Sequence, residues 1–130
     1  MDRLSCIQLY PGRRDGYVVR DGDRMTADEA ERYHSNQVKV LAAGGVDYIM
    51  FACTTYSAEA VGVVRAAEKV GVPVAVSFTT EVDGTLPGGE TLKEAVTGVD
   101  ELTGRAPVHY GVNCAHATHF MDKVGKKGDR

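Results

Sequence analysis

The feature that most constrains the fold of this 130-residue chain is the alternation of short apolar runs with longer amphipathic stretches. The runs span 4–10, 46–51, 74–78 and 108–113, and the last three begin roughly thirty residues apart, the size of a βαβ unit. Each run has the length of a strand, and the stretches between them have helical periodicity. The chain is therefore expected to form parallel strands joined by right-handed helical crossovers.

Capping signals delimit the three helices expected between the runs. Thr26 and Thr91 are each followed three residues later by Glu, which is the spacing of a capping box. Ser57 is expected to cap the helix between them. Gly71 and Gly104 are expected to end the second and third helices.

The predicted fold class is α/β, with residues 1–130 forming a single, partial domain. We expect parallel βα repeats that form the middle part of a (β/α)8 TIM barrel. Because a whole barrel needs about 250 residues, this chain corresponds to about half of one. The alternative is a small open doubly wound sheet, which would have helices on both faces and a reversal of strand order.

Composition and charge exclude several classes of function. The net charge is −3 and no basic run is longer than the pair Lys126-Lys127, so we expect no nucleic-acid partner. The apolar runs are far shorter than the ~20 residues of a membrane span, and residues 1–4 show no signal-peptide pattern. The three cysteines are odd in number and widely spaced, which indicates a reducing compartment. We therefore expect a cytoplasmic protein with no membrane partner.

Candidate functional residues gather where the predicted strands end, because active sites of parallel α/β folds lie at the carboxyl ends of strands. The candidates are Ala52, Cys53, Ser77, Thr79, Asn113 and Cys114, with His116 and His119 in the following loop.

Several chemistries remain open for these residues. Cys114 is a candidate zinc ligand, nucleophile or disulfide partner, or a small buried hydrophobe. Asn113 would either orient a substrate or tie down the loop. Cys114, His116 and His119 offer three ligands within six residues, but a fourth ligand is missing.

Two further residues are expected to have mainly structural roles. Cys53 could join a metal from a neighbouring strand end, although a packed core cysteine is favoured. His34 is expected to be a solvated or packed helix residue.

Taken together, segments spread over nearly the whole chain resemble the homocysteine S-methyltransferase family, which includes the homocysteine domain of cobalamin-dependent methionine synthase. The matching segments are Pro11-Gly12, Asp15-Gly16-Tyr17, Glu31-x-Tyr33-His34-x-x-Gln37, Ala43-Gly44-Gly45-Val46-Asp47, Val76-Ser77-Phe78-Thr79, Leu92-x-Glu94-Ala95 and Gly111-Val112-Asn113-Cys114.

The resemblance implies a (β/α)8 barrel with a zinc ion held by three cysteines and homocysteine bound as a zinc thiolate. It implies a methyltransferase of methionine biosynthesis, whose partners are a small-molecule thiol and a methyl donor. Cys114 would be a zinc ligand, Asn113 would orient the substrate, and Ser77 and Thr79 would line the pocket.

The chain departs from the family pattern in two places. Ala52 stands where family members usually carry a glutamate that helps to hold the substrate's amino group. Only Cys114 of the three zinc cysteines is present, so the zinc site is incomplete in this chain. The alternative function is a non-catalytic truncated remnant or assembly subunit. Whatever the function, we expect self-association through open sheet edges, with the apolar runs 46–51 and 74–78 most at risk of pairing with a second chain.

Overall fold

The computed structural model describes residues 6–9, 24–81 and 83–113. The elements in chain order are β1 (Cys6–Leu9), α1 (Ala27–Ala43), β2 (Tyr48–Thr54), α2 (Ser57–Val70), β3 (Val74–Thr79), α3 (Leu92–Thr103) and β4 (Tyr110–Asn113). No helix within these ranges is long and apolar enough to cross a membrane.

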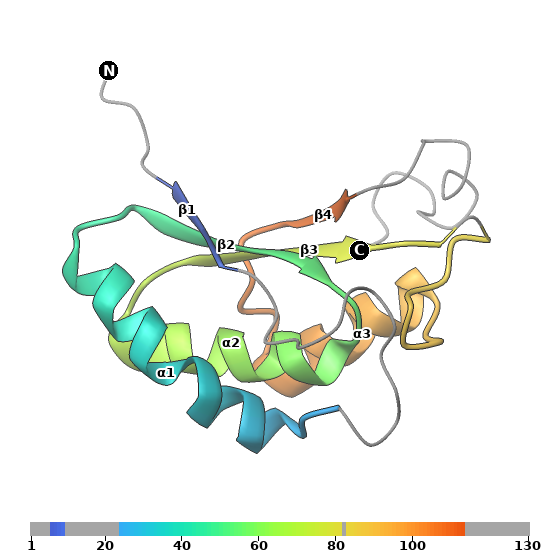
Figure 1. Cartoon of the computed structure of the whole chain (residues 1–130), viewed down its shortest axis with the longest axis horizontal. Helices are drawn as coiled ribbons and strands as arrows, with labels where there is room; N and C mark the ends of the chain where they lie inside the picture. The colour runs from blue at the N-terminus through green and yellow to red at the C-terminus, as the bar shows by residue number, and fades with distance from the viewer. Residues whose placement is uncertain (1–5, 10–23, 82, 114–130) are drawn as a thin grey trace.

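The four strands form one parallel sheet in the sequential order β1-β2-β3-β4. All three helices lie on the same side of that sheet (Figure 1). A doubly wound sheet would require a reversal of strand order and helices on both faces. The predicted α/β class is confirmed, and the arrangement is that of a section of barrel wall.

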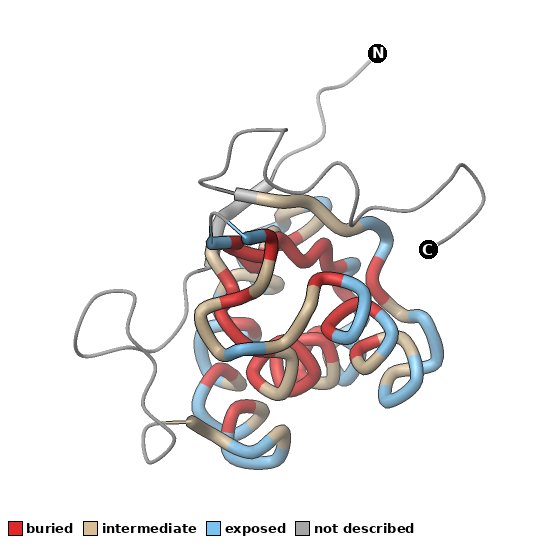
Figure 2. The backbone as a smooth tube through the Cα atoms, turned by 90° about the vertical axis from the view of Figure 1, so that its right-hand side faces the viewer, coloured by how far each residue is buried: buried red, intermediate tan, exposed pale blue. Residues whose placement is uncertain are grey.

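The hydrophobic core lies between the helix layer and the sheet, where the buried segments of the chain converge (Figure 2). Every residue of β3 is buried, as its apolar, β-branched sequence predicts. Its central side chains Val76 and Phe78 pack in the same cluster as Val61 and Val64 of α2. β2 mostly alternates between buried and half-buried positions, so it is covered less completely than β3.

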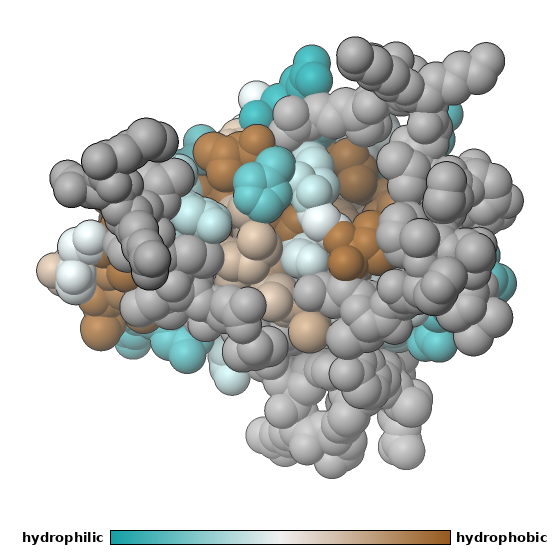
Figure 3. All heavy atoms as spheres, turned by 90° about the horizontal axis from the view of Figure 1, so that it is seen from above, coloured by the Kyte–Doolittle hydropathy of each residue, from teal (hydrophilic) through white to brown (hydrophobic). Residues whose placement is uncertain are grey.

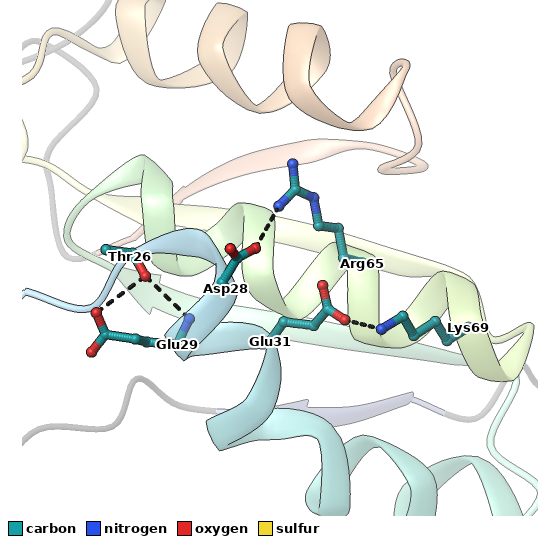
Figure 4. A network of polar contacts seen from close by, with 6 residues as sticks. All are labelled: Thr26, Asp28, Glu29, Glu31, Arg65 and Lys69. Atoms are coloured by element: carbon teal, nitrogen blue, oxygen red, sulfur yellow. Dashed lines mark hydrogen bonds and ion pairs between the residues drawn. The ribbon is translucent and has the colours of Figure 1, made fainter.

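α1 and α2 pack unusually closely because α2 carries a glycine at their contact. A Cβ atom added to Gly62 would lie 2.5 Å from the Ala30 Cβ atom and 2.8 Å from the Ala27 carbonyl oxygen. Outside this contact, Arg65 and Lys69 of α2 pair with Asp28 and Glu31 of α1 (Figure 4).

The predicted helix ends are mostly confirmed. The Thr26 hydroxyl accepts the Glu29 amide at 3.2 Å, and Thr91 and Glu94 form a complete capping box. Gly71 and Gly104 end their helices in the left-handed conformation, as predicted.

Candidate functional site

The carboxyl ends of β2, β3 and β4 (residues 52–54, 77–80 and 111–113, here called the carboxyl edge) bring predicted site residues side by side. In the ladder between β3 and β4, Ser77 pairs with Gly111 and Thr79 pairs with Asn113. These positions are more than thirty residues apart in the sequence, and only the parallel register makes them neighbours. Cys114, His116 and His119 lie outside the described residues.

Ser77 and Thr79 belong to the face of the sheet that carries no described helix. Side chains alternate along a strand, and the neighbouring residues Val76 and Phe78 pack in the core on the helix side. A Cβ atom on Gly111 would lie 3.2 Å from the Ser77 hydroxyl, so the glycine leaves room for the serine. Figure 3 looks onto this face, where apolar and polar side chains are mixed between the grey atoms.

Three threonine hydroxyls near this edge are buried without a hydrogen-bond partner among the described residues. They belong to Thr55, Thr79 and Thr80, each at most 5% exposed. A buried hydroxyl without a partner is costly, so such groups usually bond to water, an ion or a ligand. The carboxyl edge can therefore offer donors and acceptors to a small polar molecule.

Cys53 occupies an unusual backbone conformation where β2 ends. The pairing of β2 with β3 shifts register between Phe51 and Thr54, and Cys53 has a φ of 58° within this bulge. Its side chain is only half-buried but has an interaction partner, so the expectation of a core cysteine is confirmed only in part. Left-handed non-glycine residues cluster at functional sites, where the surrounding structure holds them in place. Ala52, beside it, is buried.

The start of α2 is capped by a residue from a different loop. The prediction that Ser57 caps this helix is therefore wrong. Ser57 is the first helical residue, and the N-cap Tyr56 makes no side-chain capping bond. Instead, the Glu90 carboxylate accepts the Ser57 amide at 2.7 Å and the Ser57 hydroxyl at 2.6 Å. A carboxylate is favourable there because the helix N-terminus carries partial positive charge.

The loop that carries Glu90 is also bound to the backbone before α2. The Gly88 amide donates to the Thr55 carbonyl at 3.0 Å, and Arg24 donates to the Gly88 carbonyl. A Cβ atom on Gly88 would lie 2.8 Å from the Thr55 carbonyl oxygen, so this approach requires glycine. The loop after β3 is thereby held against the connection between β2 and α2.

We expect Glu90→Ala to lower the free energy of unfolding by about 2 kcal/mol, because it removes the cap and both charge-assisted hydrogen bonds. Urea unfolding followed by circular dichroism measures the change. The exposed Glu101→Ala on α3 is the matched control and should change stability by less than about 0.5 kcal/mol. Equal effects of the two substitutions would contradict the capping role of Glu90.

Tyr56 joins this region to the residues before α1. Its hydroxyl accepts the Met25 amide at 2.9 Å, and burial raises the pKa of the phenol above its usual value of 10.0. The Arg24 guanidinium lies 6.0 Å from the centre of its ring. The phenol therefore stays neutral and serves as a hydrogen-bonding group.

The described residues do not by themselves fit a metal ion. They contain no group of three or more His, Cys, Asp or Glu side chains that could hold one. The predicted ligand Cys114 lies outside them, so the zinc site remains a prediction.

Besides the left-handed Cys53, sequence reasoning missed two contacts of this region. One is the cap of α2 by Glu90. No local sequence pattern predicts it, because Glu90 and its partner Ser57 are thirty-three residues apart. The other is a contact between His34 and Glu59, both completely buried. A glutamate among the alanines and valines of α2 was the one available signal for that contact.

The fold and the carboxyl edge together define a class of protein. The strands are parallel and in sequential order, and the helices lie on one face of the sheet. Barrel enzymes share this arrangement, with their active-site residues at the carboxyl ends of the strands.

The chain belongs to the homocysteine S-methyltransferase family, whose model matches residues 5–127. It is 26% identical over 127 residues to homocysteine S-methyltransferase 1 of Arabidopsis thaliana, covering 95% of this chain and 38% of that protein. It is 27% identical over 95 residues to homocysteine S-methyltransferase 3 of the same plant, covering 72% of this chain and 27% of that protein. The chain thus spans well under half the length of these relatives.

Among solved structures, the apo crystal structure of the homocysteine methyltransferase MmuM from Escherichia coli is similar, with a TM-score of 0.66. The match covers 89% of this chain and 40% of that one, at 19% sequence identity. At this identity the likeness supports the fold.

Proposed function

We propose that the chain acts in S-methyl transfer to homocysteine, giving methionine, and that it supplies one part of the substrate pocket. The observation that carries the proposal is the register that pairs Thr79 with Asn113, directly before Cys114 in the sequence. The Thr79 hydroxyl, which has no hydrogen-bond partner among the described residues, supports a pocket for a polar ligand. The family supports the choice of homocysteine.

In this proposal Ser77 and Thr79 line the pocket and Asn113 orients the amino acid. The thiolate sulfur of homocysteine attacks the methyl group of a sulfonium or other activated donor. The new carbon–sulfur bond forms as the bond to the donor breaks, and the donor leaves with the electron pair. Zinc, when bound, would lower the pKa of the thiol so that the nucleophile exists at neutral pH.

Zinc binding tests the proposal and separates it from the non-catalytic alternative. One zinc ion per chain in the reduced protein, lost in Cys114→Ser, would support the proposal, because thiolate is a preferred protein ligand of zinc. Metal analysis after gel filtration under reducing conditions measures the stoichiometry. Cys6→Ser is the control and should bind zinc normally. A reduced wild-type protein without zinc would favour a non-catalytic remnant or assembly subunit, for which Ala52 is the supporting residue.

We also propose that the chain associates with itself through the edges of its sheet. In the described part of the sheet, β1 and β4 each have one strand neighbour, and unpaired strand edges recruit further strands. We therefore expect β1 and β4 to be the strands that pair with a second chain. The apolar runs of β2 and β3 lie inside the sheet, where each strand already has two neighbours. We expect the average mass from light scattering to rise with concentration. A monodisperse monomer with a cooperative melt at high concentration would contradict self-association.

A further inference from the structure

His34 of α1 is a buried histidine that contacts both ends of the connection between β2 and α2. Its Nε2 atom lies 2.8 Å from the Glu59 Oε2 atom, and both side chains are 0% exposed. Its ring also meets the ring of Phe51 edge-on, with centroids 5.4 Å apart. Phe51 lies on β2 just before the bulge, and Glu59 lies in the first turn of α2.

The residues between these two contacts include the β2 part of the carboxyl edge and the connection to α2. They include Cys53 with its left-handed backbone, and Thr55, whose carbonyl receives the Gly88 amide. A left-handed conformation is strained for a non-glycine residue, and it persists only where the surrounding structure holds it. His34 contacts a residue on each side of this segment, and so it can hold the strained backbone in place.

Stability alone does not account for a buried polar pair at this place. The neighbouring core is apolar, with Ala30 and Val38 of α1 and Val63 of α2 also completely buried. Replacing a buried pair by well-packed apolar side chains is often neutral or stabilising. Apolar contacts have no preferred angle, whereas a hydrogen bond has a defined distance and angle and so sets the position of one helix relative to the other.

We propose that His34 and Glu59 are a positioning pair that sets the geometry of the segment from Ala52 to Tyr56 at the carboxyl edge. His34 fixes the first turn of α2 through Glu59 and the end of β2 through Phe51. The bulge, and with it the half-buried thiol of Cys53, is held between them. The inference concerns how this edge is shaped and requires neither homocysteine nor zinc.

The test separates position from stability with the double variant His34→Leu/Glu59→Leu. It keeps both sites filled and apolar but removes the hydrogen bond. Alkylation of Cys53 by iodoacetamide, resolved from Cys6 and Cys114 by peptide mass spectrometry, reports on the segment. We expect the double variant to melt near the wild-type temperature while its Cys53 reacts at least about tenfold faster or slower, because the segment opens or shifts locally.

A wild-type alkylation rate in a double variant that melts normally would overturn the proposal. If the double variant does not fold, the comparison is made between Glu59→Gln and Glu59→Met, below the melting temperature of both. Gln keeps an acceptor at the position of the carboxylate, whereas Met keeps only the bulk. A wild-type Cys53 rate in Glu59→Gln with an altered rate in Glu59→Met supports positioning, and equal rates in the two variants overturn it.

Discussion

Replacing His34 alone with leucine is expected to lower the free energy of unfolding by about 3–5 kcal/mol. The reason is the partner left behind. Glu59 is completely buried, and its 2.8 Å contact with the histidine would be lost while its carboxylate stays in the core. Removing one member of a buried pair is far more damaging than removing both, because the remaining group keeps its cost of leaving water.

Urea unfolding of His34→Leu, Glu59→Leu and the double variant forms a cycle that measures the coupling between the two side chains. Gln37→Leu is the control, since Gln37 is an exposed residue of the same helix and should change stability by less than about 0.5 kcal/mol. If His34→Leu lay within about 1 kcal/mol of wild type, the pair would not carry the electrostatic cost that we assign to it.

Gly62→Ala is expected to destabilise the protein by about 3 kcal/mol, although alanine normally favours a helix over glycine. The added methyl group would lie 2.5 Å from the Ala30 Cβ atom and 2.6 Å from the Glu31 amide nitrogen. Two of its three nearest atoms are backbone, so relief requires α1 and α2 to move apart. That movement loosens the packing of the whole helix pair.

Gly98→Ala is the matched control because Gly98 is also helical but has open surroundings. A Cβ atom there would meet only the Ser57 hydroxyl, at 3.8 Å. We expect this variant to gain about 0.5–1 kcal/mol from the better helix propensity of alanine. Thermal melts of the two variants should therefore shift in opposite directions. A stabilised Gly62→Ala would show that the two helices have room to spare.

Local signals predicted the elements of this fold well. Thr26 and Thr91 cap their helices because the partners of each hydroxyl lie within three residues, so the sequence already contains the whole interaction. The prediction that Ser57 caps α2 was wrong for the opposite reason. Ser57 has the right residue type, but Glu90 reaches its amide from another loop and displaces the cap to Tyr56.

The residues of the candidate site remain a prediction, and their geometry could not be predicted from the sequence. Strand ends are visible in the sequence, and they named Ser77, Thr79 and Asn113. The register that pairs Thr79 with Asn113 depends on how β4 slides against β3, which no local pattern encodes. The left-handed Cys53 was missed because bulges arise from the fit between two strands.

The sequence by itself determined the alternation of strands and helices, their parallel direction and most helix ends, because these follow from periodicity and from contacts within a few residues. It also carried the motifs that mark the family. Only the tertiary structure decided that the helices share one face of the sheet, that Glu90 caps α2, and that His34 meets Glu59 inside the core. The last two are contacts between residues thirty-three and twenty-five positions apart, and like the shared helix face they exist only once the βα units have packed together.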